Sequence, residues 1–256
     1  MAAISAHEPA TVAKPLAGRV ALITGASRGI GAAVARRLAA AGAYVAVNYS
    51  ASEAAANEVV RAIVDGGTKA IAIRADVSSE ADVKALVDQT IASFGRIDIL
   101  VNNAGIFPTQ PLTDLDSATL DNVLDINVRG PIFVTRQAVR HMGPGGRIIN
   151  FSSLAAKGAA NMAAYAGSKA FIEGLTRSLA LEFGPRGITV NAVSPGATET
   201  DMFAPMLPMK EYVVSRTPLG RLGQADDIAS VVAFLASAEA GWVTGQVIGV
   251  DGALSF

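Results

Sequence analysis

The sequence predicts an α/β protein with a single domain, in which a parallel sheet of about seven strands carries helices on both faces. Short apolar runs alternate with segments of helical length and composition along most of the chain. These runs are apolar at nearly every position, as strands buried on both faces of a parallel sheet must be. No linker or internal repeat divides the 256 residues. Right-handed crossovers then make the sheet doubly wound.

The expected elements follow one another along the chain. Strands are predicted at residues 19–24, 44–48, 70–75, 97–102, 146–152, 188–193 and 246–251. Helices are predicted at residues 30–41, 52–65, 80–94, 117–142 and 163–183. Residues 1–17 are rich in small residues and lack an apolar core of signal length, so we predict a flexible N-terminal tail. Residues 18–256 then form the single domain.

Residues 196–221 depart from the regular alternation of strand and helix. The segment holds three prolines and the apolar run MFAPMLPM, and it follows a predicted strand. Ligands of such sheets bind beyond the carboxyl ends of the strands, so we predict an apolar lid over a substrate pocket. The alternative is a pair of surface helices that pack on the core and contact no ligand.

The composition excludes several functional classes. With 51% hydrophobic and 17% charged residues, the chain can bury a large core and is too apolar for disorder. A net charge of −1 offers no basic field for nucleic acid or an acidic membrane. The chain has no cysteine, and its two histidines are far apart, so no metal site is expected. No apolar run of about 18 residues predicts a membrane span, and a cytoplasmic location is expected.

The motif TGASRGIG, residues 24–31, lies between the first predicted strand and the first predicted helix. Gly25 permits a tight turn, Gly29 lets the backbone approach a phosphate, and Gly31 permits close packing of helix on strand. The pyrophosphate of a dinucleotide then lies at the helix N-terminus, as in a Rossmann-type site. The alternative is a glycine turn that binds nothing. The expected cofactor contacts in this turn are Gly25, Ser27, Arg28, Gly29, Ile30 and Gly31.

The end of the second predicted strand indicates which dinucleotide is bound. NAD sites place an acidic residue there to hold the ribose hydroxyls. This chain has Asn48, Tyr49 and Ser50 instead, and its next acidic residue is Glu53. The guanidinium of Arg28 can pair with a 2′-phosphate, although it can also be an ordinary solvated charge. We therefore predict NADPH/NADP+ rather than NADH, with Asn48, Tyr49 and Ser50 beside the adenosine ribose.

Taken in order, the motifs resemble those of the short-chain dehydrogenase/reductase family over nearly the whole chain from about residue 18. The motifs that carry the resemblance are TGASRGIG, the pair Asp76–Val77, NNAG at 102–105, Asn127, FSS at 151–153, YAGSK at 165–169, Pro195–Gly196 and VTGQVIGVDG at 243–252. The resemblance is to the branch of carbonyl reductases and 3-oxoacyl carrier-protein reductases. It implies further cofactor contacts at Asp76, Val77, Asn103, Ala104, Gly105, Tyr165, Lys169, Pro195, Gly196, Thr198 and Thr200.

The resemblance also implies four catalytic residues: Ser153, Tyr165, Lys169 and Asn127. Ser152 is the alternative to Ser153, because the spacing to the tyrosine allows either serine. Residues four apart share a helix face, so Tyr165 and Lys169 can point into one cleft. The alternative is that they are an exposed pair without a function, because this spacing is common on helix surfaces. A nearby ammonium and an oxidised nicotinamide both favour the phenolate, so we expect a lowered tyrosine pKa. A shift of about 3 units corresponds to about 4 kcal/mol.

The expected reaction is reduction of a ketone or aldehyde to an alcohol. Tyr165 donates the proton as general acid, and Ser153 holds the carbonyl oxygen by a hydrogen bond. Lys169 tunes Tyr165 and anchors the nicotinamide ribose, and Asn127 holds a water molecule, as in the family. The apolar segment favours a hydrophobic ketone, aldehyde or β-keto ester as the substrate.

Three alternatives remain at this point. A 3-oxoacyl carrier-protein reductase would need a basic docking residue where this chain has Phe133, although Arg129, Arg136 or Arg186 can serve instead. A non-catalytic dinucleotide-binding regulatory protein would share the fold. An epimerase or dehydratase would need a larger substrate domain than 256 residues allow. The family pairs its long helices across a two-fold axis, so we expect a homotetramer, with a dimer as the alternative.

Overall fold

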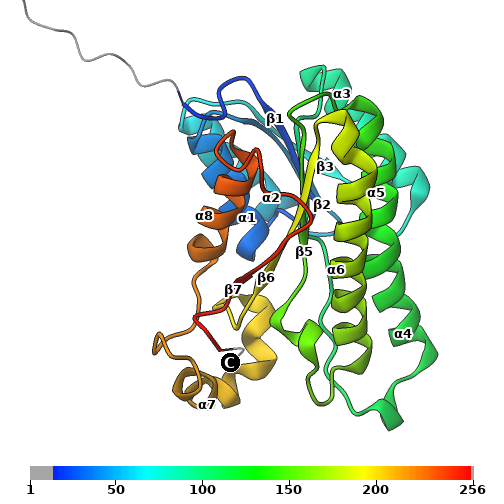
Figure 1. Ribbon diagram of the computed structural model, residues 1–256, viewed down its shortest axis with the longest axis vertical. Helices are drawn as coiled ribbons and strands as arrows, with labels where there is room; N and C mark the ends of the chain where they lie inside the picture. Colours follow the sequence, from blue (N-terminus) through cyan, green and yellow to red (C-terminus); the bar gives the residue numbers. More distant parts are fainter. Residues whose placement is uncertain (1–13, 255–256) are drawn as a thin grey trace, which may run out of the picture.

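The computed structural model describes residues 14–254, and within them seven parallel strands form one sheet in the order β3-β2-β1-β4-β5-β6-β7 (Figure 1). The strands are β1 Val20–Ile23, β2 Tyr44–Tyr49, β3 Ala70–Arg74, β4 Ile99–Asn102, β5 Arg147–Phe151, β6 Thr189–Pro195 and β7 Val247–Val250. Each predicted strand has its counterpart here, so the predicted sheet is confirmed. The order along the sheet reverses between β1 and β4, where a doubly wound sheet opens its ligand crevice.

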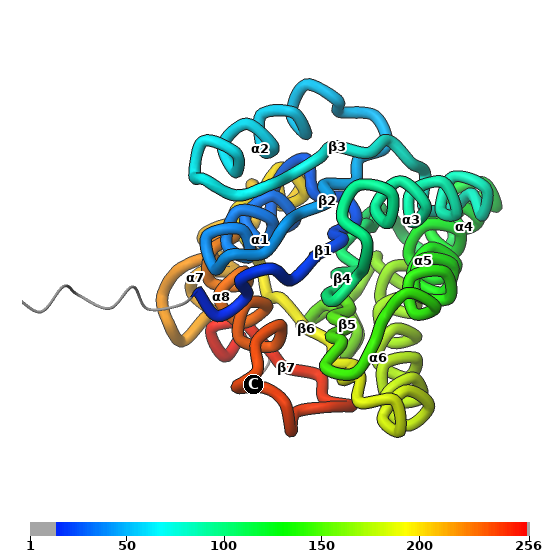
Figure 2. The backbone as a smooth tube through the Cα atoms, turned by 90° about the horizontal axis from the view of Figure 1, so that it is seen from above, coloured from blue at the N-terminus to red at the C-terminus, as the bar shows by residue number. Residues whose placement is uncertain are grey.

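Helices cover both faces of the sheet, as Figure 2 shows from above. On one face lie α1 Gly29–Ala40, α2 Glu53–Asp65 and α8 Ala225–Ala236, and on the other lie α3 Glu80–Phe94, α5 Gly130–Ala138 and α6 Ala163–Phe183. Strand side chains alternate between the two cores: Ile23 packs with α1 and α8, whereas Leu22 packs with α3 and α5. This alternation explains why apolar residues occupy most strand positions on both faces of the sheet.

The predicted helix at 117–142 is not continuous. It consists of α4 Ser117–Val123, a π-helical segment Leu124–Arg129, α5, and a 3₁₀ turn Val139–His141. Pro131 has no N–H to donate to the carbonyl of Asn127 four residues earlier, so regular α-helical bonding is interrupted there. Single π-helical turns are frequent at functional sites, and this one contains Asn127, one of the predicted catalytic residues.

The connection from β6 to β7 contains the predicted apolar segment. A 3₁₀ helix Asp201–Met209 and the short helix α7 Lys210–Ser215 lie at the lower end of the molecule in Figure 1, beyond β6. Its Phe203 is buried, while Met202, Leu207 and Met209 are exposed. Helix α8, which follows, was not among the predicted helices.

The predicted tail, residues 1–17, lies mostly outside the described residues. Of its last residues, Leu16 is 1% exposed and packs in the core with α1. The N–H of Leu16 also donates a hydrogen bond of 2.9 Å to the carbonyl of Ala41. Packing of the chain against the sheet therefore begins two residues before the predicted domain boundary at residue 18.

Candidate active site

A cavity of about 900 Å³ opens beyond the carboxyl ends of the strands. The glycine turn after β1 and the loops after β4, β5 and β6 surround it, together with the first turns of α6 and the apolar segment. Cavities of this size hold small ligands and cofactors. Its lining includes most of the predicted site residues: Gly25, Ser27, Arg28, Gly29, Ile30, Gly31, Asn103, Ala104, Gly105, Ser153, Tyr165, Lys169, Pro195, Gly196, Thr198 and Thr200.

The glycine turn is shaped by contacts that a side chain would break. Gly25 and Gly29 have φ of +62° and +57°, in the left-handed region that favours glycine. A Cβ on Gly31 would lie 2.4 Å from the carbonyl oxygen of Gly25 and 2.5 Å from Nδ2 of Asn103. Asn103 holds the turn by donating hydrogen bonds of 2.9 Å to the carbonyls of Thr24 and Gly25. Its amide nitrogen therefore shapes the turn.

Five of the predicted cofactor contacts do not line this cavity: Asn48, Tyr49, Ser50, Asp76 and Val77. The side chain of Asn48 is 1% exposed, and both ends of its amide bind backbone groups. The Asn48 side chain thus joins the glycine turn to β2 and β3, and its contact with the ribose stays a prediction. Asp76 accepts hydrogen bonds from the N–H and hydroxyl of Ser78 at the entry to α3.

Arg28 connects the glycine turn to the apolar segment. Its guanidinium forms an exposed ion pair with Asp201, with 3.6 Å between Nη1 and Oδ2. Both residues line the cavity, and Asp201 is the first residue of the 3₁₀ helix. The only predicted cation of the turn thus has a carboxylate beside it, in competition with any anionic ligand.

Helix α6 brings Tyr165 and Lys169 to the cavity on one face, as the i,i+4 spacing predicts. Nζ of Lys169 lies 5.7 Å from the centre of the tyrosine ring and donates a hydrogen bond of 2.9 Å to the carbonyl of Phe151. The ring of Phe107 meets that of Tyr165 edge-on, with 4.7 Å between centroids. The pair is buried within the site rather than displayed on the surface.

Burial shapes the titration of both groups. It lowers the pKa of Lys169 to about 8, because an ammonium loses hydration in the interior. Burial also raises the pKa of Tyr165, since the phenolate is the charged form, while a hydrogen bond with the Ser153 hydroxyl acts in the opposite direction. The expected lowering of the tyrosine pKa is thus not found in the protein alone, where desolvation outweighs the stabilising contacts.

The two candidate serines have different partners. Ser153 shares a hydrogen bond with Tyr165, and its Oγ accepts another of 3.2 Å from the N–H of Ala155. Oγ of Ser152 donates toward Oε1 of Glu173 at 2.9 Å and the carbonyl of Lys169 at 3.3 Å. The geometry therefore puts the hydroxyl of Ser153, rather than that of Ser152, beside the tyrosine.

Asn127 is 1% exposed and does not line the cavity. Its Nδ2 donates to the carbonyl of Ile106 at 3.0 Å and to Oγ of Ser168 at 3.1 Å, and its Oδ1 accepts from the N–H of Ile106 at 2.9 Å. The side chain expected to hold a water molecule is thus bound to protein groups. It fixes the loop after β4 against α6, close to Lys169.

The loop after β6 borders the cavity beside the glycine turn, since a Cβ on Gly29 would lie 3.6 Å from the Thr200 side chain. A Cβ on Gly196 would lie 2.7 Å from Cα of Asp251, so only glycine lets this loop pass the end of β7. Oγ1 of Thr198 donates to the carbonyl of Gly196 at 3.0 Å, and Oγ1 of Thr200 to that of Thr198 at 3.4 Å. Both hydroxyls therefore stabilise the loop itself.

Sequence reasoning missed most of the apolar wall of the cavity. This wall comprises Ile106, Phe107, Leu154, Met162 and Leu254, in addition to the predicted apolar segment with Phe203, Met206 and Val213. Three of these residues follow a recognised motif directly, since Ile106 and Phe107 come after NNAG and Leu154 after FSS. That proximity was the available signal. Met162 and Leu254 carry no such signal, because only the fold brings them to the cavity.

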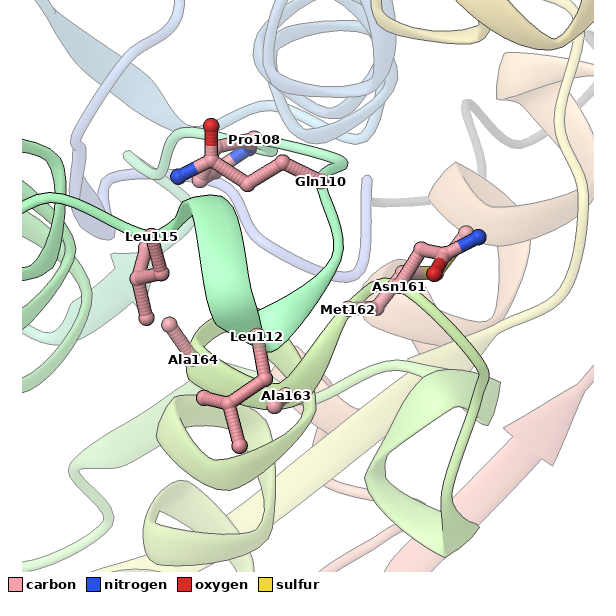
Figure 3. A pocket seen from close by; sticks show the side chains of 8 residues that line it. All are labelled: Pro108, Gln110, Leu112, Leu115, Asn161, Met162, Ala163 and Ala164. Atoms are coloured by element: carbon pink, nitrogen blue, oxygen red, sulfur yellow. The ribbon is translucent and has the colours of Figure 1, made fainter.

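A second hollow beside the active site is too small for a substrate (Figure 3). Its volume is about 10 Å³, roughly that of one water molecule. It lies where the loop after β4 meets the start of α6, with the N–H of Gln110 donating 2.8 Å to the carbonyl of Asn161. In Figure 3 the amide of Gln110 lies near Pro108, and its Nε2 is buried without a partner.

Across residues 14–254, no cluster of three or more His, Asp or Glu side chains is arranged to hold a metal ion. None of the helices described is both long and apolar enough to span a membrane. The cytoplasmic location expected from the sequence stays a prediction.

Comparisons with known proteins identify relatives that are reductases and dehydrogenases. The family model described as Enoyl-(Acyl carrier protein) reductase matches residues 25–255. Versicolorin reductase 1 of Dothistroma septosporum is 45% identical over 254 residues, covering 93% of this chain and 96% of its own. A probable tetrahydroxynaphthalene reductase of Zymoseptoria tritici is 44% identical over 253 residues, covering 93% and 95%.

Among solved structures, a short chain dehydrogenase from Burkholderia cenocepacia J2315 in complex with NADP superposes with a TM-score of 0.92. It is 45% identical and covers 94% of this chain and 100% of its own. This chain belongs to the short-chain dehydrogenase/reductase family and is an oxidoreductase.

Proposed function

We propose that this short-chain dehydrogenase/reductase uses NADPH to reduce a hydrophobic ketone, with a ring ketone of the aromatic type as the preferred substrate and a β-keto ester as the next candidate. The observation that carries the proposal is the position of Tyr165. Its ring lies between Lys169 and Phe107, next to Ser153, where the glycine turn and the apolar wall share one cavity. An acid group is thus placed where a cofactor and an apolar carbonyl compound can meet.

The residues present fit a dinucleotide phosphate. The first turn of α1 contains no acidic residue, so its N-terminus has no carboxylate to repel a pyrophosphate. Gly25 to Gly31 present backbone to the cavity, and Arg28 supplies a guanidinium that matches a 2′-phosphate. The relative from Burkholderia, which shares this fold, was solved with NADP, and the cofactor assignment follows that likeness together with these residues. NADPH supplies the hydride.

The side chains of the site provide the proton and hold the oxygen. Because burial raises the pKa of Tyr165, its hydroxyl is protonated at neutral pH and can donate that proton to a carbonyl oxygen. Ser153 donates a hydrogen bond to the same oxygen as negative charge develops there. Lys169 holds positive charge close to the tyrosine, which favours the phenolate that remains after proton transfer.

The apolar wall of the cavity favours a flat, apolar substrate. Phe107 offers an aromatic edge beside the tyrosine, and Met162, Met206 and Phe203 add apolar, adaptable surface. Two relatives bear the names of aromatic ring substrates, versicolorin and tetrahydroxynaphthalene, and share over 40% of their residues with this chain. A flat, apolar ring ketone suits such a wall better than a flexible polar chain.

The 3-oxoacyl carrier-protein reductase alternative is weakened because its three candidate docking arginines already have partners within the chain. Arg129 is paired with Asp125 and Arg136 with Glu80, both on the surface. Arg186 donates hydrogen bonds of 2.7 and 2.9 Å to the carbonyls of Val139 and Met142. All three arginines thus have partners within the chain, and an acidic carrier would have to displace them.

The predicted homotetramer remains a proposal. Several large apolar side chains are exposed on α6 and near β7, including Leu181, Phe171 and Trp242, which is 99% exposed. Exposed apolar residues of this size are typical of surfaces that associate. Light scattering tests the assembly: a mass near four chains supports it, and a monomer mass contradicts it.

Steady-state oxidation of NADPH by purified protein tests the function. A tetralone, an alkyl β-keto ester, an aliphatic aldehyde and an acyl thioester serve as substrates, with Tyr165→Phe as the matched variant. We expect the tetralone to turn over fastest, and we expect Tyr165→Phe to bind NADPH in a fluorescence titration while losing at least about 100-fold in kcat.

Near-normal turnover by that variant would refute the mechanism. Binding of NADPH without reduction of any carbonyl would favour the non-catalytic alternative, and preference for the thioester would favour the carrier-linked one.

A further inference from the structure

Three consecutive residues at the end of β5 each contact a different turn of α6. Ser153 shares a hydrogen bond with Tyr165, the carbonyl of Phe151 accepts from Nζ of Lys169, and Ser152 donates to Glu173. The helix residues stand at positions i, i+4 and i+8, which is one continuous face. The first two contacts involve the proposed catalytic groups, whereas the third involves two residues without an assigned role.

We infer that the hydrogen bond from Ser152 to Glu173 is a positioning clamp, which sets the register of β5 against α6 and so places Ser153 and Lys169 relative to Tyr165. The inference rests on the reductase function proposed above. Ser152 and Glu173 are positioning residues, because they bind each other and the side-chain hydrogen bond of Tyr165 is with Ser153.

The clamp is built from a buried and well-partnered hydroxyl. Ser152 is 3% exposed, and its Oγ lies 2.9 Å from Oε1 of Glu173 and 3.3 Å from the carbonyl of Lys169. Both acceptors belong to α6, one at Lys169 and one a turn later at Glu173, so the single hydroxyl proton of Ser152 ties the strand to this part of the helix. Because Ser152 is covalently joined to Phe151 and Ser153, any shift of Ser152 moves both catalytic contacts together. Displacements of about 1 Å in an active site can lower turnover about 100-fold.

A second link between the same two elements provides a matched control. Nδ2 of Asn150 donates 2.9 Å to Oγ1 of Thr176, whose hydroxyl in turn donates 2.8 Å to the carbonyl of Ile172. This link also joins β5 to α6 through a buried hydroxyl, and neither Asn150 nor Thr176 lines the cavity. Loss of the Thr176 hydroxyl therefore removes a comparable hydrogen bond between β5 and α6 that does not involve Ser152 or Ser153.

The kinetic test compares Ser152→Ala, Glu173→Leu, Glu173→Gln, the double variant Ser152→Ala/Glu173→Leu and Thr176→Val, with unfolding measured for each. Glutamine keeps an acceptor oxygen for Ser152 and loses only the charge. We expect Ser152→Ala and Glu173→Leu each to lower kcat about tenfold or more, and the double variant to be no worse than either alone. Glu173→Gln should stay within about threefold of wild type, and Thr176→Val should lose stability but keep kcat.

A second readout does not depend on turnover. The phenolate absorbance of Tyr165 is titrated in wild type and in Ser152→Ala, each corrected by subtracting the same protein carrying Tyr165→Phe. The charged side chains that share the cavity are Lys169, Arg28, Lys157 and Asp201, and Ser152→Ala changes none of them. We expect the tyrosine to titrate at higher pH in Ser152→Ala, because Ser153 no longer holds its hydrogen bond to the phenolate.

The outcomes separate the clamp from the function on which it rests. Loss of kcat in Ser152→Ala, with rescue by Glu173→Gln and a shifted phenolate titration, supports the clamp. Wild-type kcat and an unchanged titration in Ser152→Ala overturn it, as does an equal loss of kcat in Thr176→Val. If the wild type reduces no carbonyl compound, the proposed function fails, and the titration alone still decides whether Ser152 positions the site.

Discussion

The side-chain oxygen of Asn48 accepts a hydrogen bond of 3.2 Å from the backbone N–H of Gly25. This contact joins the end of β2 to the glycine turn. The amide nitrogen of Asn48 completes the link by donating to the carbonyls of Ala75 at 3.0 Å and Ile73 at 3.3 Å. The position at which NAD-binding relatives of this fold place an acid thus organises three strand ends in this protein.

Asn48→Asp should therefore destabilise the protein instead of conferring a preference for NADH. The aspartate has no N–H to donate to the carbonyls of Ile73 and Ala75, which accept from the amide of Asn48 in the wild type. Leaving buried polar groups without a partner costs about 1–3 kcal/mol. Denaturant unfolding measures the loss, and the ratio of kcat/KM for NADPH and NADH measures the preference. A stable variant that prefers NADH would show that Asn48 contacts the ribose after all.

Gly31→Ala should disrupt the cofactor turn. Its Cβ would lie 2.4 Å from a backbone oxygen, and backbone cannot move aside as a flexible side chain can. We expect a loss of about 1–3 kcal/mol in unfolding free energy and a much weaker affinity for NADPH. Gly143→Ala is the control, because a Cβ there meets no atom within 4 Å and Gly143 has no positive φ. Similar behaviour of the two variants would contradict the packing argument.

Arg28 and Asp201 should have opposite effects on cofactor choice. We expect Arg28→Ala to raise KM for NADPH about tenfold with little change for NADH, because the charge-assisted contact with the 2′-phosphate is lost. Asp201→Asn removes the carboxylate that lies 3.6 Å from Arg28, so it should lower KM for NADPH. Steady-state kinetics with both cofactors decides. Equal changes for NADPH and NADH would mean that Arg28 does not contact the 2′-phosphate.

Lys169 should make stability depend on pH in the alkaline range. Burial lowers its pKa from 10.5 to about 8, so between these values the unfolded chain binds more protons than the folded one. Stability therefore rises with pH across this window, because burial of the ammonium disfavours folding below about pH 8 and this penalty disappears above 10.5. The full effect is about 3 kcal/mol, at about 1.36 kcal/mol for each pKa unit between 10.5 and about 8.

The measurement compares the unfolding free energy of Tyr165→Phe with that of the double variant Tyr165→Phe/Lys169→Met. Both proteins lack the Tyr165 phenol, so its titration does not contribute to the difference. We expect this difference to shift in favour of the lysine as pH increases from 8 to 10.5. A flat difference would show that Lys169 titrates at its ordinary pKa, and hence that solvent reaches it.

The sequence was sufficient for the sheet because its signal is local. A run such as VALI of β1 is apolar on both faces, and that pattern has few other structural solutions. The glycine turn was likewise readable, since its spacing and its place between strand and helix occur within eight residues. The break at Pro131 was present in the sequence as well, but the long apolar pattern around it favoured one continuous helix.

The roles within the site could be predicted only in part. The i,i+4 spacing of Tyr165 and Lys169 placed both in one cleft, because a helix fixes that relation locally. The partners of Asn48 and Asn127 were not predictable, since their amides bind backbone groups 21 to 27 residues away along the chain. The choice between Ser152 and Ser153 likewise depended on the position of α6.

By itself the sequence determined the doubly wound parallel sheet, the dinucleotide turn and the residues able to carry proton transfer, because each follows from spacing along a strand or a helix. Tertiary structure alone decided which of these side chains face the cavity and which stabilise the loops around it. It also decided the direction in which the pKa of Tyr165 is shifted. The physical reason is that hydrogen-bond partners and desolvation depend on what surrounds a group in space, and neighbours from distant elements leave no local pattern in the sequence.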